Sequence, residues 1–219
     1  MATSPERKER LKVLVADDHS VVRRGLRQIL SEAFSGVTVG EAANTRELLA
    51  LLEENRWDIV LLDISMPGRN GLDCLKDIKY RQPHIPVLVL SVHPEDQFAV
   101  RTLRAGAAGY MTKESAPEEL VKAIEKVLGG GRYVSASFAE RLAANLAAPI
   151  PQAPHELLSD REYEVMLLIA HGRTVKEIAG DLCLSVKTIS TYRAHIIRKT
   201  KLQNNAEIIR YALRNALVQ

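Results

Sequence analysis

Short apolar runs alternate with amphipathic segments over the first 130 residues of the chain. Five runs of mostly aliphatic residues have the length and continuity of buried parallel strands, at 11–16, 37–42, 59–63, 86–91 and 109–111. Segments with apolar residues three and four apart, as in helices that cover a sheet, lie at 22–33, 44–55, 71–81, 95–105 and 116–128. This alternation predicts an α/β fold with a doubly wound, five-stranded parallel sheet.

The pattern changes after residue 130. Glycines 129–131 end the last amphipathic segment, and three prolines within 149–154 favour an extended linker. Between them, 135–148 can form a short helix, which either docks on a partner or covers one edge of the sheet. We expect an N-terminal tail, an α/β domain, a linker and a small all-α domain of four helices, at 1–10, 11–130, 131–155 and 156–219 respectively.

Three predicted helix starts carry the Ser/Thr-x-x-Glu spacing of a capping box, in which each side chain accepts a hydrogen bond from the other residue's backbone N–H. They are Ser115 with Glu118, Ser159 with Glu162, and Thr174 with Glu177. Pro117 suits the first turn of the first of these helices. A further helix is expected to begin at Ser185.

Composition narrows the class of protein. Hydrophobic residues make up 46% of the chain and charged residues 26%, which is enough for an ordinary core. The two cysteines, Cys74 and Cys183, lie far apart, which excludes a disulfide framework and a cysteine-based zinc cluster. No apolar run approaches the roughly 18 residues of a membrane span, and the polar first ten residues do not resemble a signal peptide. We expect a soluble, cytoplasmic protein.

The net charge of +3 is unevenly distributed. Residues 1–130 hold 18 Lys and Arg against 19 Asp and Glu, whereas residues 156–219 hold ten against seven. Within the second region, 182–206 contains five basic residues and no acidic one. Such a stretch either meets a polyanion or forms a solvated basic helix face.

Polar side chains stand at the ends of four predicted strands. Asp17 and Asp18 follow the first strand, Asp63 ends the third, Ser91 ends the fourth and Lys113 follows the fifth. Ligands of open parallel sheets bind at the carboxyl ends of the strands. A carboxylate there can attack a phosphoryl group, while Mg²⁺, an ammonium and a hydroxyl stabilise the phosphoryl oxygens. The alternative is that each aspartate only caps the helix that follows its strand.

These residues resemble the receiver domain of two-component response regulators, a flavodoxin-like fold, over 11–128. The resemblance rests on Asp17-Asp18, Asp63 followed by Met66-Pro67-Gly68 and Gly71, Ser91, and Tyr110 three residues before Lys113. It implies that Asp63 accepts a phosphoryl group from a sensor histidine kinase. It also implies a Mg²⁺ (or Mn²⁺) ion bound by Asp18, Asp63 and the backbone carbonyl of Ser65, with Asp17 acting through water.

The same resemblance implies a switch pair, Ser91 and Tyr110, and a phosphoryl-stabilising Lys113. Glu114 departs from the proline that many receivers have after the lysine. An aspartyl phosphatase of the haloacid-dehalogenase type is the rival from the enzyme class. Those enzymes usually carry a second aspartate two residues after the nucleophile, where this chain has Ser65. We therefore expect a phosphoryl acceptor, with no catalytic residue beyond the phosphorylation site.

The predicted helix that begins at Ser185 has two distinct faces. Ile189, Tyr192 and Ile196 recur at spacings of three and four and define an inward face. The opposite face carries Lys187, Ser190, Thr191, Ala194 and Arg198. Small residues there allow close approach to a DNA groove, and basic ones can pair with phosphates. The alternative is a surface helix of a protein-binding bundle.

Residues 157–217 resemble the LuxR-type helix-turn-helix domain of NarL/FixJ response regulators. The matching motifs are Leu158-Ser159-Asp160-Arg161-Glu162, Gly172, Lys176-Glu177-Ile178-Ala179, Leu184-Ser185, Lys187-Thr188-Ile189 and Lys201-Leu202. Val175, Tyr192 and Asn205 depart from the usual Asn, His and Arg. The resemblance implies contacts to double-stranded DNA by Lys187, Thr188, Ser190, Thr191, Ala194, Arg198, Lys199 and Lys201.

The two resemblances together predict a transcription regulator without a membrane partner. Mg²⁺-dependent phosphorylation of Asp63 would switch homodimerisation and sequence-specific DNA binding. Two alternatives stay open: a receiver whose partner is another protein, and regulation that does not depend on phosphorylation.

Overall fold

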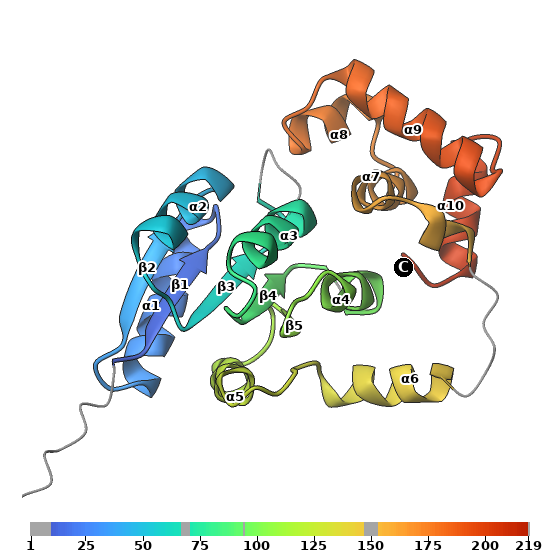
Figure 1. Cartoon of the computed structure of the whole chain (residues 1–219). Coiled ribbons are helices and arrows are strands. Elements are labelled where there is room, and N and C mark those ends of the chain that lie inside the picture. The colour runs from blue at the N-terminus through green and yellow to red at the C-terminus, as the bar shows by residue number, and fades with distance from the viewer. Residues whose placement is uncertain (1–9, 67–70, 94, 147–152, 219) are drawn as a thin grey trace, which may run out of the picture.

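The computed structural model describes residues 10–66, 71–93, 95–146 and 153–218 of the chain. Pro67, Gly68 and most of the predicted N-terminal tail lie outside them. Figure 1 shows an α/β part followed by a helical part. None of the helices in the described ranges combines the length and the apolar character that a membrane span requires.

The predicted parallel sheet is confirmed, with five strands in the order β2-β1-β3-β4-β5. The strands are β1 (Lys12–Ala16), β2 (Thr38–Ala42), β3 (Ile59–Asp63), β4 (Val87–Ser91) and β5 (Gly109–Thr112). Of the three inner strands, β3 and β4 are buried along their whole length, and β1 is buried except at Lys12. Aliphatic residues on both faces of a strand favour this position, since helices cover both faces of a parallel sheet.

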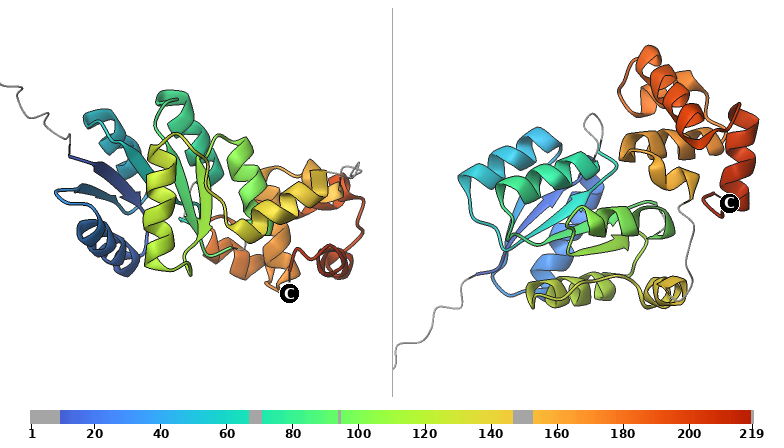
Figure 2. Two further views of the ribbon diagram at one scale, coloured as in Figure 1. Left: turned by 90° about the horizontal axis from the view of Figure 1, so that it is seen from below. Right: turned by 45° about the vertical axis from the view of Figure 1, so that its right-hand side comes forward.

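Five helices of the α/β part form the two outer layers. They are α1 (Ser20–Ala33), α2 (Thr45–Glu54), α3 (Gly71–Arg81), α4 (Glu95–Arg104) and α5 (Pro117–Leu128). Alternate strand residues serve opposite faces: Val13 and Val15 pack with α1 and α5, whereas Leu14 and Ala16 pack with the core of α2, α3 and α4. Figure 2 shows the two helical layers from two further directions.

The segment after α5 pairs with β5, the strand at one edge of the sheet. Tyr133 forms a parallel bridge with Gly109, and its carbonyl accepts a hydrogen bond from the Tyr110 N–H at 2.9 Å. Gly109 permits this approach because a Cβ there would meet the Tyr133 carbonyl at 2.8 Å. The helix predicted over 135–148 is α6 (Ala136–Leu146), which extends away from α5 (Figure 1). The residues before α6, rather than α6 itself, therefore pair with the exposed strand edge.

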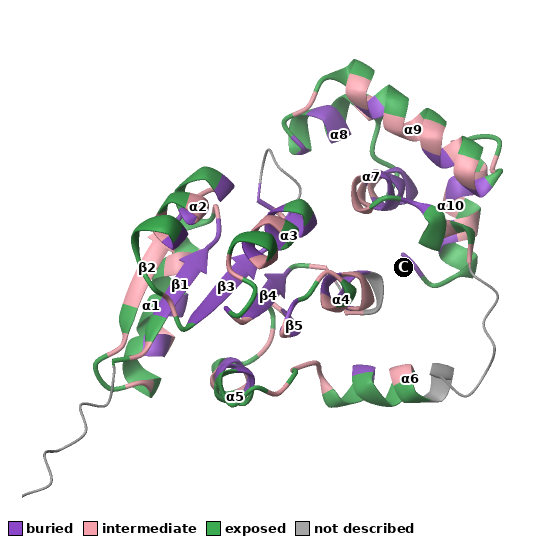
Figure 3. Cartoon of the chain, in the orientation of Figure 1, coloured by how far each residue is buried: buried purple, intermediate pink, exposed green. Residues whose placement is uncertain are grey.

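The C-terminal part is helical, as predicted. It consists of the short 3₁₀ helix η1 (Pro154–Leu157) and of α7 (Asp160–Ala170), α8 (Val175–Asp181), α9 (Val186–Thr200) and α10 (Asn205–Arg214). Helix α7 is the most buried of these helices, as its mostly purple ribbon in Figure 3 shows. The capping boxes at Ser159 and Thr174 are both formed, and the Ser185 hydroxyl caps α9.

The capping box predicted at Ser115 is wrong. Helix α5 begins one residue later, with Ala116 as its N-cap residue and Pro117 in the first turn, and no side chain caps it. The Ser115 hydroxyl lies 3.2 Å from that of Thr112, so it contacts the end of β5 instead of the helix. Pro117 fixes a helical φ and needs no N–H acceptor, which makes a capping side chain less important here.

We predict opposite effects on stability for two glycine-to-alanine substitutions. In Gly71→Ala the new Cβ would overlap the backbone of Ile64, so unfolding should become easier by about 3 kcal/mol. Gly25→Ala, inside α1 with no atom within 4 Å, should instead stabilise the protein by roughly 0.5–1 kcal/mol. Chemical denaturation of the two variants and the wild type tests this; a neutral Gly71→Ala would contradict the close packing at this site.

Candidate functional site

The carboxyl ends of four strands bring the predicted polar side chains together. Asp63 and Ser91 are the last residues of β3 and β4, and Asp17 and Lys113 directly follow β1 and β5. The two aspartates and the serine are almost fully buried. Parallel strands make this convergence possible, because all of their carboxyl ends lie at one edge.

Lys113 joins the two buried carboxylates. Its Nζ lies 2.6 Å from Asp17 Oδ2 and 2.6 Å from Asp63 Oδ2. Its backbone N–H donates to the Ser91 carbonyl at 2.8 Å, which ties the loop after β5 to the end of β4. The ammonium therefore compensates negative charge that would otherwise be costly to bury.

Backbone amides fix the orientation of the same carboxylates. The N–H of His19 donates to Asp17 Oδ1 at 2.8 Å, and the N–H of Ser65 donates to Asp63 Oδ1 at 2.7 Å. In each case the donor lies two residues after the aspartate, as in an Asx turn. Each carboxylate thus has one oxygen held by the backbone and the other turned toward Lys113.

Burial raises the pKa of Asp63 above its ordinary value, although the hydrogen bond and charge of Lys113 act in the opposite direction. The Lys113 pKa is also raised: burial lowers it, but the hydrogen bonds to Asp17 and Asp63 outweigh that effect. A desolvated carboxylate beside a single ammonium is a better nucleophile than a hydrated one, provided that it is ionised.

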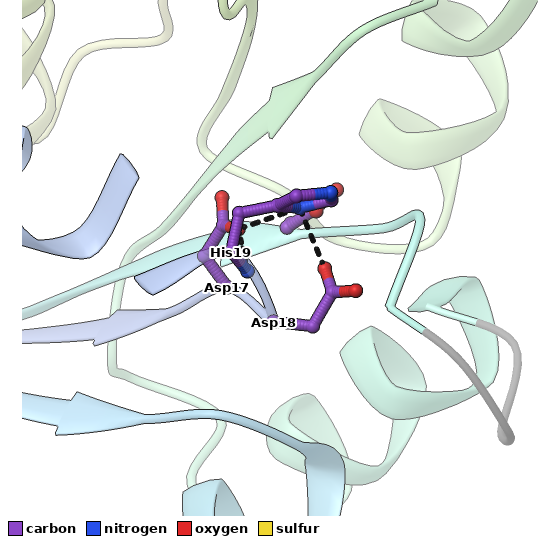
Figure 4. A group of neighbouring side chains, drawn as sticks. Asp17, Asp18 and His19 are labelled. Atoms are coloured by element: carbon purple, nitrogen blue, oxygen red, sulfur yellow. Dashed lines mark hydrogen bonds and ion pairs between the residues drawn. The ribbon is translucent and has the colours of Figure 1, made fainter. Parts of the chain in front are cut away.

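The site has the donor set of a divalent cation. One ligand atom from each of Asp17, Asp18, His19 and Asp63 lies within 4.8 Å of the others. Asp18 Oδ1 is buried and accepts no hydrogen bond from any described residue. Figure 4 shows how Asp17, Asp18 and His19 converge. Carboxylate oxygens suit Mg²⁺ and Mn²⁺; the proposed contribution of the Ser65 carbonyl stays a prediction.

The two predicted switch residues meet on one loop. The Ser91 hydroxyl accepts a hydrogen bond from the His93 N–H at 3.1 Å, and the Tyr110 hydroxyl donates to the His93 carbonyl at 2.8 Å. Both side chains are fully buried, and burial raises the pKa of Tyr110. The Tyr110 ring is thus already directed inward in this structure.

Aromatic rings continue from this loop into the helical part. The His93 ring lies 4.8 Å from that of Phe98 on α4, and Phe98 meets Tyr163 of α7 edge-on at 5.6 Å. Phe98 and Tyr163 are both buried, so they form part of one continuous core. The sequence analysis missed this contact, because aromatic residues 65 positions apart show no common spacing.

Arg101 makes the main polar contact between the two parts of the chain. It donates to the carbonyls of His155 and Leu158 at 2.8 and 2.9 Å and pairs with Asp160 at 3.2 Å. Its guanidinium also lies 4.2 Å from the centre of the Tyr163 ring. Lys76 of α3 adds a second ion pair to Asp160, at 2.7 Å, beside a cleft of about 370 Å³. One helix, α4, therefore carries the apolar contact and the main polar contact to the helical part.

The predicted DNA-reading face of α9 is exposed. Ile189 and Ile196 are fully buried and Tyr192 is half-buried, as expected for the inward face. The outward residues are all exposed: Lys187, Ser190, Thr191, Ala194 and Arg198. The turn before α9 contains Cys183 in the left-handed conformation, at φ 53°. Helices α8 and α9 with this turn have the arrangement of a helix-turn-helix.

Three further residues of the predicted DNA contacts lie at the ends of α9. Thr188 is half-buried, and its hydroxyl lies 2.8 Å from that of Ser185. Lys201 is exposed and ends the helix in the left-handed conformation. Lys199 points to the buried Glu162 of α7, at 2.5 Å, so its ammonium already has an anionic partner. Their contact with DNA stays a prediction.

Comparison with known families agrees with this two-part arrangement. Residues 13–125 match the family described as response regulator receiver domain, and residues 156–212 match bacterial regulatory proteins of the luxR family. The chain is 40% identical over 209 residues to the response regulator GacA of Pseudomonas aeruginosa, which covers 95% of this chain and 98% of that protein. It is 36% identical over 208 residues to the response regulator UvrY of Escherichia coli, covering 94% and 95% of the two chains.

Solved structures of relatives have the same fold. RcsB from Salmonella enterica serovar Typhimurium, bound to promoter rprA in the presence of a phosphomimetic, aligns with a TM-score of 0.65 at 30% identity. The alignment covers 92% of this chain and 98% of that one. A further RcsB structure, described by its conformational dynamism for DNA interaction, has a TM-score of 0.67.

We predict that Glu162→Gln destabilises the helical part in a pH-dependent manner. Burial opposes ionisation of Glu162, but hydrogen bonds from Lys199 and Ser159 outweigh it and lower the pKa. A lowered pKa stabilises the folded state above the unfolded pKa of about 4.3, and this stabilisation is lost as pH falls. Glutamine preserves the capping box but not the charge, so unfolding should become easier by about 1–3 kcal/mol at pH 7.

Chemical denaturation between pH 3.5 and 7.5 measures this effect. Glu177→Gln, at the same position in the exposed capping box of α8, is the matched control and should change stability less. An equal loss in both variants, or a loss at Glu162 that does not shrink at low pH, would contradict a charge-dependent contact.

Proposed function

The chain belongs to the NarL/FixJ-type response regulators, which regulate transcription in two-component signalling, and we propose that phosphorylation of Asp63 controls its binding to DNA. The observation that carries this proposal is the position of Lys113, whose ammonium lies 2.6 Å from both buried carboxylates. This geometry provides a nucleophile with a cation beside it, which is the requirement of an aspartyl phosphoryl acceptor.

In the proposed reaction an oxygen of Asp63 attacks the phosphorus of a donor. The P–N bond to a histidine of the sensor kinase breaks, or the P–O bond of a small acyl phosphate, and the donor leaves with the electron pair. Lys113, whose Nζ lies 2.6 Å from Asp63 Oδ2, and the hydroxyl of Ser91, at the end of the neighbouring strand β4, would then contact the transferred oxygens. When bound by Asp18 and Asp63, with Asp17 acting through water, Mg²⁺ supplies the remaining positive charge.

The chain acts in this proposal as an acceptor and not as an enzyme with outside substrates. Asp63 is almost fully buried, and Ser65 stands where an aspartyl phosphatase would need its acid–base aspartate. Nothing in the described pocket therefore supports repeated turnover. Because its partners are a kinase and DNA, we propose a cytoplasmic location.

We propose that the acyl phosphate is transmitted through the loop after β4. Ser91 and Tyr110 both bond to the backbone of His93, so a shift of either side chain toward the phosphoryl group displaces this loop. Helix α4 follows the loop directly and carries Phe98 and Arg101, which hold the helical part. Phosphorylation biases an existing equilibrium between the held and the released helical part.

The exposure of the reading face of α9 supports a mechanism in which phosphorylation changes the orientation of the helical part. It does not support one in which the α/β part covers this face before phosphorylation. Lys187, Thr191 and Arg198 are accessible although α4 and α7 are in contact. Release of the helical part would let two copies pair, with recognition helices about 34 Å apart, one DNA turn. We propose that Lys187, Arg198, Lys199 and Lys201 contact phosphates and that Thr188, Ser190, Thr191 and Ala194 lie near the bases. Of these, Thr188 is half-buried and Lys199 would exchange its ion pair with Glu162 for a phosphate.

The first test measures DNA binding by the full chain with and without Mg²⁺ and beryllofluoride, which occupies the position of a phosphoryl group on an aspartate. Binding to a duplex selected from genomic fragments should tighten by about tenfold or more for the wild type and remain unchanged for Asp63→Asn. Because phosphates are contacted, affinity should fall steeply with salt.

Lys187→Ala is the control within the same assay. It removes an exposed cation from the reading face, so binding should weaken in every condition while the ratio with and without beryllofluoride stays constant. If the wild type binds DNA equally well with and without Mg²⁺ and beryllofluoride, Asp63 does not control DNA binding. Absence of binding in every condition would favour a receiver whose partner is another protein.

We also predict that Arg101→Ala releases the helical part without phosphorylation. Loss of its hydrogen bonds and ion pair should shift the equilibrium toward the released state by about tenfold. Small-angle X-ray scattering should then give a larger radius of gyration for the unphosphorylated chain, and its DNA binding should approach that of the activated wild type. Arg104→Ala, one turn along α4 and exposed, should leave both measurements unchanged.

A further inference from the structure

His155 lies in the cleft between the α/β part and the helical part. It belongs to η1 and is half-buried, and its backbone carbonyl accepts a hydrogen bond from Arg101 of α4 at 2.8 Å. Its ring contacts two tyrosines, since the ring centres of Tyr163 and Tyr211 lie 6.0 and 5.9 Å away. His155 Nδ1 is also 2.8 Å from the Tyr211 hydroxyl. The residue therefore connects α4, α7 and α10.

The cleft already holds more positive than negative charge. Its charged lining consists of three basic and two acidic side chains: Lys76, Arg101, Arg104, Glu156 and Asp160. Asp160 is shared by two of the bases, at 2.7 Å from Lys76 and 3.2 Å from Arg101. Glu156 is exposed, and water weakens its attraction for a neighbouring cation. Among the described lining residues, a further positive charge would find no unshared, buried carboxylate.

The remaining groups around η1 do not supply a counter-charge either. Helix α9 also packs against η1, but its His195 and Lys199 contact Glu162 of α7, at 3.4 and 2.5 Å. The hydroxyls of Tyr163 and Tyr211 are neutral, because burial raises the pKa of both. Arg101 and Glu156 are therefore the charged groups that act on His155.

Protonation of the imidazole would weaken its contacts in the cleft. A neutral ring with its proton on Nε2 accepts at Nδ1 the hydrogen bond that the Tyr211 hydroxyl donates, whereas a protonated ring donates from both nitrogens. The hydroxyl would have to turn its hydrogen away, and the imidazolium would lie near the Arg101 guanidinium. Like charges in a partly desolvated cleft repel, and the helical part relieves this repulsion by moving away from α4.

The pKa of His155 is shifted in the direction that this repulsion requires. Burial lowers the pKa, and Arg101 acts in the same direction, against Glu156. After release, the pKa would return toward its ordinary value of about 6.5. The held form thus binds fewer protons than the released form. It is fully favoured above about pH 6.5 and loses this advantage as the pH falls below that value.

We propose that His155 is a pH-sensitive switch between the two parts of the chain: its neutral ring holds the helical part on α4, and its protonation releases that part without phosphorylation. Histidine suits this role, because its charge changes within the range of pH that cells reach. The inference rests on the held and released forms of the proposed function. It adds mild acidification as a second input to the same equilibrium.

Small-angle X-ray scattering of the full chain at pH 7.5 and pH 5.5, without Mg²⁺ or beryllofluoride, tests the proposal. On acidification, the ratio of released to held molecules should rise by about threefold or more in the wild type. His155→Gln keeps an acceptor for Tyr211 but carries no charge at either pH, so its ratio should stay constant. His84→Gln removes an exposed histidine beside the start of β4 and should respond like the wild type.

A permanent charge provides the complementary variant. His155→Lys should give at pH 7.5 the ratio that the wild type reaches at pH 5.5, and circular dichroism verifies that each variant is folded. His93→Gln tests the histidine that packs on Phe98 of α4. If His93→Gln abolishes the response and His155→Gln retains it, His155 is not the switch. A wild type that does not respond to pH would also overturn the proposal.

Beryllofluoride with Mg²⁺ at pH 7.5 separates this proposal from the proposed function. If it releases the helical part of the wild type while acidification does not, the inference about His155 is wrong and control by Asp63 stands. If neither treatment releases the helical part, the equilibrium between held and released forms is overturned for both.

Discussion

The contact of one ammonium with two buried carboxylates is the constraint on which the site depends. Asp17 and Asp63 have almost no exposure, and Lys113 is their nearest cation at 2.6 Å from each. Two carboxylates and one ammonium leave one negative charge, in a place where desolvation makes charge expensive. A divalent ion beside Asp18 would balance this remaining negative charge. A phosphoryl group on Asp63 would add further negative charge, which that ion and Lys113 would stabilise together. The charge balance in the pocket therefore holds these side chains in place, and an added ion or phosphoryl group would change that balance.

In the proposed function, the effect of phosphorylation reaches the helical part through the short loop that contains His93. The backbone of His93 bonds both Ser91 and Tyr110, and α4 begins two residues later. Helix α4 then contributes Phe98 to an apolar contact and Arg101 to a polar one, both with the segment that contains η1 and α7. A polar contact of this kind gives a defined orientation at small net stability, which suits an equilibrium that a single charge must shift.

Helix α9 packs against the rest of the helical part through the face opposite its predicted DNA-reading face. Ile189 and Ile196 are buried, and Lys199 pairs with Glu162 of α7, which also forms the capping box of that helix. The reading face itself remains exposed while α4 contacts α7. This exposure supports the proposal that phosphorylation controls how the helix-turn-helix is oriented, with the predicted DNA-reading face already formed.

The sequence by itself determined the fold class, the strand-end residues and most helix starts, because these follow from local periodicity, from capping spacings such as Ser159 with Glu162, and from the common edge of parallel strands. It misplaced the cap of α5, where Pro117 sets the start and Ser115 contacts Thr112. It could not reveal the partners of Arg101 or Lys199, or the turn of His19 toward Asp18. Charged residues on a helix face have the same local pattern whether they meet water or another domain, so only the tertiary structure decided those contacts.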